Sequence, residues 1–472
     1  MKLPISFVES TRALMGDEEY QELSVALEQE PPASVRLNSK FPGLAACSSI
    51  SGRIPWAAEG YYLNQRLTFT FDPLFHAGCY YVQEASSMFV EQVLRRYVTT
   101  PVKMLDLCAA PGGKSTHARS VLPEGSLLVA NEVIRNRSQI LAENLTKWGY
   151  ADVVVTNNDP SDFSRIGSFF DVILTDVPCS GEGMFRKDPG AIEEWSPENV
   201  EICWQRQRRI ITDIWPCLKP GGILIYSTCT YNTRADEENS TWIRQEFGAE
   251  PLPLAVPTEW NITGSLLVGV DAPVYRFLPH KTQGEGFFLA ALRKPEEDRE
   301  ADTDLFSPKK KKSKGDTAAS PVSKENLAIA KSWLASSDEY NLLVNGTAIT
   351  AFPVYYQNDL ALLRQSLRIV QAGTEVAEVK GKDLIPAHGL AMSRLLKTSV
   401  FSTEALTYEQ AIAYLRKEAI VLPPSVPKGY VLVTYKEIPL GFVKNIGNRA
   451  NNLYPQEWRI RSGYLPDDIR TL

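Results

Sequence analysis

Two cysteines stand where reactive side chains could lie in this 472-residue chain. Cys229 follows the apolar run Ile223 to Ser227, and Cys179 follows a similar run that ends at Asp176. Both runs have the character of buried parallel strands, and open parallel sheets bind ligands beyond the carboxyl ends of their strands. A lone cysteine there is more often a small buried residue than a nucleophile. Two cysteines on neighbouring strands would face one cleft, which favours a reactive pair.

A loop of small residues precedes a predicted helix that begins at Gly113. The loop follows the strand 102–107 and consists of Cys108, Ala109, Ala110, Pro111 and Gly112. Small side chains let a ligand approach the backbone, and the free amides of a helix N-terminus can donate to it. A Walker loop would need a glycine where this chain has Cys108, and the Gly-x-Gly-x-x-Gly pattern is absent. We therefore expect a ligand less charged than a triphosphate.

Acidic residues follow successive predicted strands. Glu132 comes after the strand 127–130, where Rossmann-type sites hold ribose hydroxyls. Asp159 comes after the strand 152–156 and could meet an adenine amine. Each acid alone is more often a cap or turn residue, but with Asp176 the series is harder to explain that way. Together the acids favour S-adenosylmethionine, an adenosine-bearing cofactor without a dinucleotide phosphate bridge.

A thiol pair beside a methyl donor suggests methylation of cytosine. Carbon 5 of cytosine is a poor nucleophile, but addition of a thiolate to carbon 6 makes it able to accept a methyl group. A protonated Asp176 could deliver a proton to ring nitrogen 3, and Lys114 could lower a thiol pKa or orient Asp176. The spacing leaves open which of Cys179 and Cys229 attacks.

The elements that must position these residues lie between residues 99 and 294. Short apolar runs alternate there with longer amphipathic segments, which is typical of a doubly wound, Rossmann-like α/β sheet. We predict helices at 113–121, 135–148 and 197–218, and a late strand at 286–292.

Four further segments flank this predicted methyltransferase domain. Residues 1–98 are predicted to form an N-terminal α+β module that binds RNA or packs on the core. Residues 295–325, with the run Lys309 to Lys312, are predicted to form a disordered charged linker. Beyond the linker we expect a small α+β module at 326–384 and a β-rich module at 385–472.

The β-rich module carries a local basic surplus. Residues 436–461 hold five basic side chains against two acidic ones, whereas the whole chain has a net charge of -6. With Phe442, Tyr454 and Trp458 interleaved, this pattern is that of an RNA-binding face. Scattered surface charge with buried aromatics would explain the spacing about equally well. The candidate RNA contacts in this module are Lys436, Lys444, Arg449, Arg459 and Arg461. Arg36, on the predicted strand 34–38 of the N-terminal module, is a further candidate.

The composition excludes several other classes. The seven cysteines form no Cys-x-x-Cys pair and the chain has only four histidines, which argues against a disulfide framework and a zinc site and fits a reducing cytoplasm. No signal peptide or bilayer-length apolar run is evident. We expect a cytoplasmic monomer without a metal and without a membrane partner.

Three segments resemble the signature motifs of the Sun-type RNA cytosine-5 methyltransferases. They are Asp106 to Ser115, Asp176 to Gly183 and Tyr226 to Thr230. Residues 34–38 and 83–87 resemble the N-terminal motifs of that family. Residues 440–444, 451–455 and 458–459 are similar to the PUA-like module of its RsmF branch, whose members modify small-subunit ribosomal RNA.

The resemblance implies a role for each matching residue. Cys229 would be the nucleophile, and Cys179 would assist release of the methylated base. The residues implied to bind the cofactor are Cys108 to Lys114, Glu132, Asp159 and Asp176, with Arg137 a weaker candidate. Many relatives have a glycine after the aspartate that is Asp159 here, whereas this chain has Pro160.

We therefore predict an S-adenosylmethionine-dependent RNA cytosine-5 methyltransferase that acts on small-subunit (16S) ribosomal RNA. One alternative is the same chemistry on transfer RNA or DNA. The other is a non-catalytic RNA-binding protein that keeps the fold, against which the intact Cys179, Cys229, Glu132 and Asp176 argue.

Overall fold

The structure is a computed structural model that describes residues 2–270, 272–296 and 322–472. Its centre is a nine-stranded sheet in which the order is β10-β12-β9-β8-β5-β6-β7-β15, with β11 paired to β12. The parallel strands are β5 (Lys103–Asp106), β6 (Leu127–Asn131), β7 (Val153–Thr156), β8 (Phe170–Asp176) and β9 (Leu218–Thr228). Strand β5 pairs with both β6 and β8, so the strand order reverses at β5. The predicted doubly wound α/β core is confirmed.

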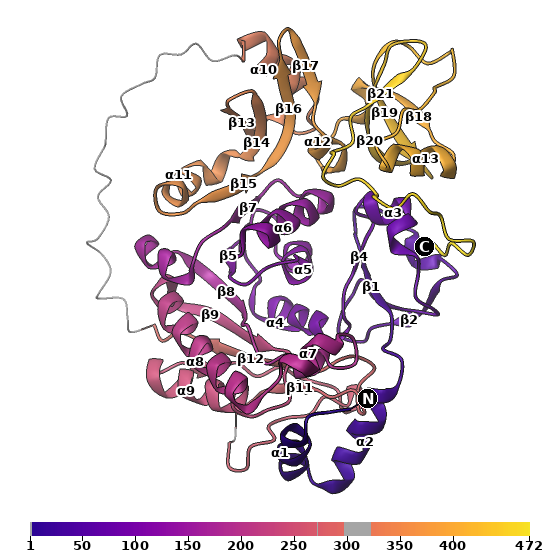
Figure 1. Cartoon of the computed structure of the whole chain (residues 1–472). Helices are drawn as coiled ribbons and strands as arrows, with labels where there is room; N and C mark the ends of the chain where they lie inside the picture. The colour runs from indigo at the N-terminus through magenta and orange to yellow at the C-terminus, as the bar shows by residue number, and fades with distance from the viewer. Residues whose placement is uncertain (1, 271, 297–321) are drawn as a thin grey trace.

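Helices cover both faces of this sheet (Figure 1). Helices α4 (Val90–Tyr97), α5 (Gly113–Val121) and α6 (Arg135–Trp148) cover one face, and α8 (Pro197–Ile214) and α9 (Glu237–Phe247) cover the other. Leu128 and Ala130 of β6 pack in the first layer, and Leu127 and Val129 in the second, as the two-residue period of a strand requires. Helix α8 ends four residues before the predicted 218, because Pro216 has no amide with which to continue it.

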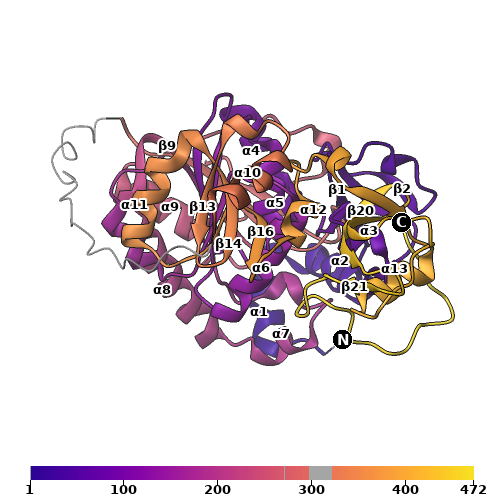
Figure 2. The same ribbon diagram turned by 90° about the horizontal axis from the view of Figure 1, so that it is seen from above.

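Antiparallel strands extend the sheet at both edges. On one edge β12 (Phe287–Arg293) pairs with β9, and β10 (Glu250–Pro251) and β11 (Tyr275–Phe277) pair with β12. On the other edge β15 (Ile369–Ala372) pairs with β7. Strand β15 belongs to the segment 326–384, so this segment is joined to the central sheet by main-chain hydrogen bonds. Figure 2 shows the orange segment beside the purple strands of the core.

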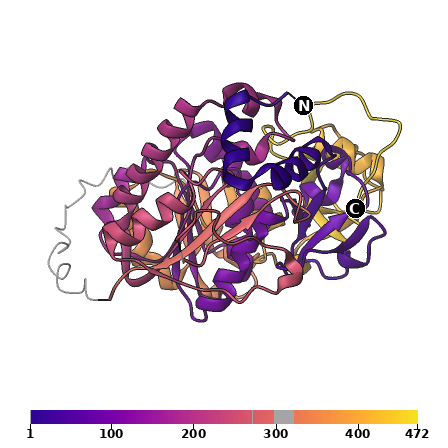
Figure 3. The same cartoon turned by 90° about the horizontal axis from the view of Figure 1, so that it is seen from below.

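The N-terminal segment combines a helical pair with a small antiparallel sheet. Helices α1 (Ile5–Met15) and α2 (Asp17–Glu28) precede the sheet β2-β3-β1-β4 and helix α3 (Pro73–His76). The strands are β1 (Ser34–Leu37), β2 (Ile50–Arg53), β3 (Gly60–Leu63) and β4 (Tyr80–Val82). Phe7 and Leu23 of the helical pair pack against Phe185 and Trp195 of the core. Figure 3 shows this indigo helical pair against the magenta helices from below.

Two four-stranded sheets lie between residues 340 and 452. The first contains β13 (Tyr340–Asn345), β14 (Ala348–Pro353), β16 (Thr374–Lys380) and β17 (Asp383–Pro386). The second contains β18 (Ser402–Ala405), β19 (Gly429–Tyr435), β20 (Ile438–Asn445) and β21 (Ala450–Asn452). The accompanying helices are α10 (Lys324–Ser332), α11 (Gln357–Ser366), α12 (His388–Met392) and α13 (Tyr408–Leu415).

Two of the predicted boundaries between modules fall inside a helix or a strand. Helix α10 begins at Lys324, just inside the predicted linker 295–325, of which 297–321 lie outside the described residues. The predicted boundary after residue 384 lies within β17. The division of the chain into these modules stays a prediction.

The N- and C-terminal segments share one hydrophobic core. Val35 and Leu74 from the first lie in the same cluster as Leu415 and Val433 from the last. The Leu472 amide also donates to the Asp72 Oδ2 atom over 2.8 Å. In Figure 1 the yellow end of the chain accordingly lies beside the indigo sheet. Removal of the C-terminal segment would therefore expose apolar surface of the N-terminal sheet.

Candidate active site

A cavity of about 470 Å³ lies at the carboxyl ends of β5, β8 and β9. The core domain contributes Cys108, Lys114, Asp176, Cys229 and Phe287 to its wall, and the N-terminal segment contributes Ser34, Arg66, Tyr81 and Gln83. The cavity thus opens where the strand order reverses, the usual ligand site of a doubly wound sheet. Its volume is within the range of small-molecule sites.

The two candidate cysteines meet beside this cavity. Strands β8 and β9 are neighbours, as predicted, and the Sγ atoms of Cys179 and Cys229 are 3.2 Å apart. The Cys229 side chain belongs to the cavity wall, and Cys179 lies next to it. The hydrogen bond to Cys179, together with burial, raises the pKa of the Cys229 thiol, whereas the charge of Lys114 opposes the rise. The nucleophilic form is the thiolate, so this balance controls reactivity.

An ion pair faces Cys229 from the same wall. Lys114, in the first turn of α5, places Nζ 2.8 Å from the Asp176 Oδ2 atom at the end of β8. The Ser227 hydroxyl donates to the other carboxylate oxygen over 2.9 Å. Burial alone would lower the pKa of Lys114, but the Asp176 carboxylate outweighs it and the pKa is raised. The cavity therefore contains a firmly protonated ammonium group beside a thiol.

The small-residue loop leads from β5 into α5, as predicted. Gly112 has a φ of +113°, which only glycine adopts readily, and it directly precedes the helix. Below the loop, Asp106 is buried and its Oδ2 atom accepts from Ser115 over 2.6 Å, while Oδ1 has no hydrogen-bond partner among the described residues. Burial raises the pKa of Asp106 to about 7. An unsatisfied buried acceptor under a loop of small residues fits a polar ligand with donor groups, as S-adenosylmethionine is.

Three predicted cofactor residues, Glu132, Arg137 and Asp159, lie outside the described lining of this cavity. Buried Glu132 accepts from the Ile134 amide over 2.9 Å and lies 3.4 Å from the Arg137 guanidinium. Arg137 in turn donates to the Ala110 carbonyl over 2.8 Å, so α6 supports the loop from behind. Asp159 caps the 3-10 helix Pro160–Ile166, in which Pro160 occupies a favourable first position. Contact of these residues with the cofactor stays a prediction.

The prediction that Arg36 contacts RNA is wrong. Its side chain is 1% exposed, donates to Gln83 over 2.8 Å and to Thr116 over 2.6 Å, and lies over the Trp148 ring. Arg36 therefore ties β1 to α5. Phe442 and Tyr454 of the predicted RNA face are also buried and cannot stack on bases, which agrees with the alternative of buried aromatics, whereas Trp458 is half-buried.

The C-terminal cations differ in how they are partnered. Lys444 is paired with Asp383 over 2.6 Å, Arg459 donates to a main-chain carbonyl, and Lys436 donates to Leu472. Arg449 and Arg461 are exposed, and within the described ranges their guanidinium groups have no ion pair. Binding of RNA by any of these side chains stays a prediction.

Two buried carboxylates near the cysteines were missed by sequence analysis. Glu182 accepts from the Tyr231 and Asn232 amides, and Asp236 accepts from the Thr228 hydroxyl. The sequence offered one signal for Glu182, an acid between two glycines shortly after Cys179. It offered no comparable signal for Asp236.

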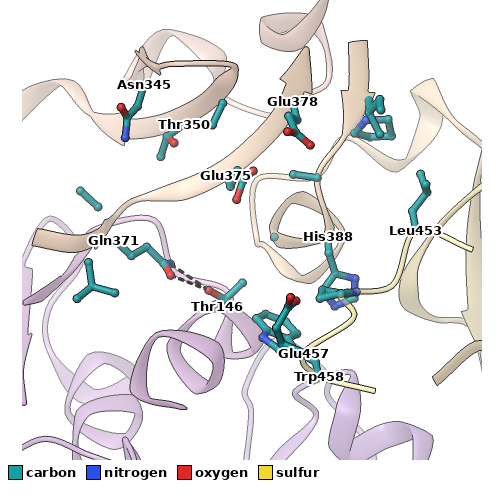
Figure 4. Close-up of a pocket in the computed structure, with 18 of the residues that line it drawn as sticks. Thr146, Asn345, Thr350, Gln371, Glu375, Glu378, His388, Leu453, Glu457 and Trp458 are labelled. Atoms are coloured by element: carbon teal, nitrogen blue, oxygen red, sulfur yellow. Dashed lines mark hydrogen bonds between the residues drawn. The ribbon is translucent and has the colours of Figure 1, made fainter. Parts of the chain in front are cut away.

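A larger cavity, of about 770 Å³, lies where α6, the sheet β13-β14-β16-β17 and residues 453–458 meet (Figure 4). The Gln371 amide donates to Thr146 across this junction over 3.0 Å. The charged residues of its lining are balanced: Arg364, Lys380 and Lys417 against Glu375, Glu378 and Glu457. In the described part of the chain, no cysteine lines this junction cavity.

The described residues contain neither a candidate metal site nor a candidate membrane span. Within 2–270, 272–296 and 322–472 there is no group of three or more His, Cys, Asp or Glu side chains arranged to hold a metal ion. Over the same ranges no helix combines the length and apolarity needed to span a bilayer. The monomeric state and the lack of a metal stay predictions.

Fold and site together define a Rossmann-like methyltransferase. The chain belongs to the family described as 16S rRNA methyltransferase RsmB/F, whose profile matches residues 99–293. The N-terminal domain of 16S rRNA methyltransferase RsmF matches residues 3–85, and the methyltransferase RsmF PUA domain matches 402–460. The predicted family, the PUA-like module and the cofactor S-adenosylmethionine are thereby confirmed.

Individual relatives match over most of the chain. A protein named ribosomal RNA small subunit methyltransferase F from Shigella boydii serotype 4 is 30% identical over 433 residues, which cover 87% of this chain and 85% of that protein. A protein of the same name from Escherichia coli O81 has the same identity and coverage.

Solved structures from Pyrococcus horikoshii share the fold. A methyltransferase homolog protein has a TM-score of 0.51 at 27% identity, over 62% of this chain and all of the other (100%). NSun6 with SFG has a TM-score of 0.52 at 22% identity, over 62% of this chain and 98% of the other.

Proposed function

We propose that this chain transfers a methyl group from S-adenosylmethionine to carbon 5 of a cytosine in small-subunit ribosomal RNA, through a covalent cysteine adduct. The observation that carries the proposal is the thiol pair, 3.2 Å apart, beside the Lys114 and Asp176 ion pair. The names of the relatives support ribosomal RNA as the substrate.

Cys229 is the proposed nucleophile, because its side chain belongs to the cavity wall. Its thiolate adds to carbon 6 of the base and makes carbon 5 electron-rich. Lys114 favours the thiolate. The proton that leaves the Cys229 thiol would pass through Asp176, which Lys114 and Ser227 hold, to ring nitrogen 3 of the base. When bound, S-adenosylmethionine supplies an electrophilic methyl group for carbon 5.

Cys179 is the proposed base that ends the reaction. After methylation its thiolate takes the proton from carbon 5, and the bond between carbon 6 and the Cys229 sulfur breaks. Cys229 leaves as a thiolate, and ring nitrogen 3 returns its proton to Asp176. A sulfur atom 3.2 Å from the nucleophile supports this role. The loop Cys108 to Lys114 would hold the cofactor, with Glu132, Arg137, Asp159 and Asp176 as further candidate contacts.

The test uses labelled S-adenosylmethionine with ribosomal RNA and small ribosomal subunits. We expect Cys229→Ala to abolish both transfer and adduct while cofactor binding persists. We expect Cys179→Ala to accumulate a protein-RNA adduct that survives denaturation, because addition and methylation still occur but release fails. An adduct from Cys229→Ala would reverse the two roles. Label on transfer RNA or DNA alone, or on no cytosine at all, would overturn the proposal.

A further inference from the structure

The buried carboxylate of Glu182 connects the loop that carries Cys179 to the loop that carries Cys229. We propose that Glu182 is a positioning residue that fixes the distance between the two sulfur atoms. Its effect on methyl transfer rests on the proposed function, whereas its effect on the sulfur atoms does not.

The contacts of Glu182 reach both loops. The side chain is 1% exposed, and Oε2 accepts from the Tyr231 amide over 2.7 Å and the Asn232 amide over 3.0 Å. On the other oxygen, Oε1 accepts from the Asn232 side chain over 2.7 Å and from the Ser180 hydroxyl over 3.0 Å. Ser180 directly follows Cys179, and Tyr231 comes two residues after Cys229. A shift of this carboxylate would therefore move one sulfur atom relative to the other.

The hydrogen-bond partners of Glu182 suit a side chain with two acceptor oxygens. The partners named above present N–H or O–H groups to Glu182, and so does the Trp195 indole, which donates to Oε1 over 2.9 Å. A carboxylate only accepts, whereas a glutamine of the same shape would turn an NH₂ group toward one set of donors. Glu182→Gln thus breaks one side of the connection with little change in volume.

The two loops also touch along their backbones. The Gly183 amide donates to the Cys229 carbonyl over 2.8 Å. A Cβ atom on Gly183 would lie 2.7 Å from the Gly286 carbonyl oxygen and 2.8 Å from that of Cys229, so no larger residue fits. Because this contact is so close, a small displacement at Glu182 is passed on to Cys229. Asp236 holds the flanks of Cys229 from the other side, through Thr228 over 2.5 Å.

The test measures the geometry without RNA. Reduced protein is treated with dibromobimane, which becomes fluorescent when it alkylates two neighbouring thiols. We expect Glu182→Gln to slow bridging by about tenfold or more, and transfer to fall by about a hundredfold, since misplacement by 1 Å has costs of that order. Single alkylation of each cysteine and cofactor binding should persist, because Glu182 contacts neither Lys114 nor the cofactor loop in the described structure. Cys179→Ala and Cys229→Ala each lack one of the two thiols, so their fluorescence gives the background of the bridging assay.

Two further variants make the test specific. Trp195→Phe removes one donor to the same carboxylate but belongs to neither cysteine loop, so bridging should stay near the wild-type rate. Asn232→Ala removes a side-chain donor on the Cys229 loop and keeps the backbone amide, so bridging should slow, but less than in Glu182→Gln. The inference would be overturned if Glu182→Gln bridged at the wild-type rate, or if Trp195→Phe lost as much of the bridging rate as Glu182→Gln. Failure of the cytosine chemistry would leave the bridging result unchanged.

Discussion

The active-site cavity and the junction cavity differ in how their charged groups are arranged. In the smaller one, Lys114 and Asp176 come from different elements and meet beside the Cys229 thiol. In the larger one, Glu375 and Glu378 share one strand, and the charges of the wall cancel (Figure 4). Volume alone would therefore choose the wrong cavity. A thiol and an ion pair that meet in one wall are a better criterion for a reactive site.

The two cavities also differ in what lies behind them. The loops beside the active-site cavity are held by the buried carboxylates Glu182 and Asp236. The walls of the junction cavity come from three separate segments, joined across the gap by contacts such as Gln371 to Thr146. Tight positioning suits chemistry, in which small displacements are costly. The shape of a cavity between segments depends instead on how those segments pack against one another.

The largest expected effect that would test this contrast comes from Lys114→Met. It removes the cation beside Cys229, so the thiolate and the proton transfer to the base both lose support. We expect single-turnover methyl transfer, followed with labelled cofactor at saturating RNA, to fall by about 10²- to 10⁴-fold.

The matched control is Lys380→Met in the junction cavity. Lys380 is also paired with a carboxylate, Glu378, over 3.0 Å, so the chemical change is the same. Transfer should stay within about twofold of wild type, as for most surface changes. Similar losses in both variants would remove the distinction between the two cavities.

A smaller effect is expected in the pH dependence of Cys229. The hydrogen bond to Cys179 is the leading cause of its raised pKa, so Cys179→Ala should lower that pKa and move the reactivity curve toward lower pH. Lys114→Met should move the curve the opposite way. Below the pKa, a displacement by one pH unit changes the thiolate fraction about tenfold.

The measurement is the rate of iodoacetamide alkylation of the Cys229 peptide, quantified by mass spectrometry across pH. This readout needs no RNA and separates Cys229 from the other cysteines. A curve that moves toward higher pH in Cys179→Ala would contradict the assigned cause.

The core could be predicted from the sequence because its signals are local. Helices α5 and α6 have the predicted bounds, since glycine and proline positions and apolar periodicity mark both ends. The pairing of β15 with β7, by contrast, joins residues more than 200 positions apart, and no local sequence pattern predicts it. The burial of Arg36 is similar, because its partner Thr116 lies 80 residues away.

In the candidate site, too, residues with a local sequence signal could be predicted and residues with distant partners could not. Cys108, Asp176 and Cys229 could be predicted because each stands at or just beyond a strand end, and Lys114 because it lies in the first turn of the helix that follows β5; strand ends of one sheet meet. Glu182 could not be given a role, because its donors Tyr231 and Asn232 are 49 and 50 residues away. Partners of a buried carboxylate are fixed by tertiary packing.

The smallest expected effect concerns the basic C-terminal segment and compares free with paired cations. Arg449 and Arg461 are exposed, without an ion pair in the described ranges, whereas Lys444 is paired with Asp383. Unpaired cations are the ones available to neutralise phosphates. We expect Arg449→Gln with Arg461→Gln to weaken RNA binding and to reduce the salt slope of log affinity by about 1 for each lost contact. Lys444→Gln should change the slope less, since its charge is already neutralised. Titration of labelled ribosomal RNA at several salt concentrations measures the slopes, and a larger change for Lys444→Gln would show that pairing with Asp383 gives way to RNA.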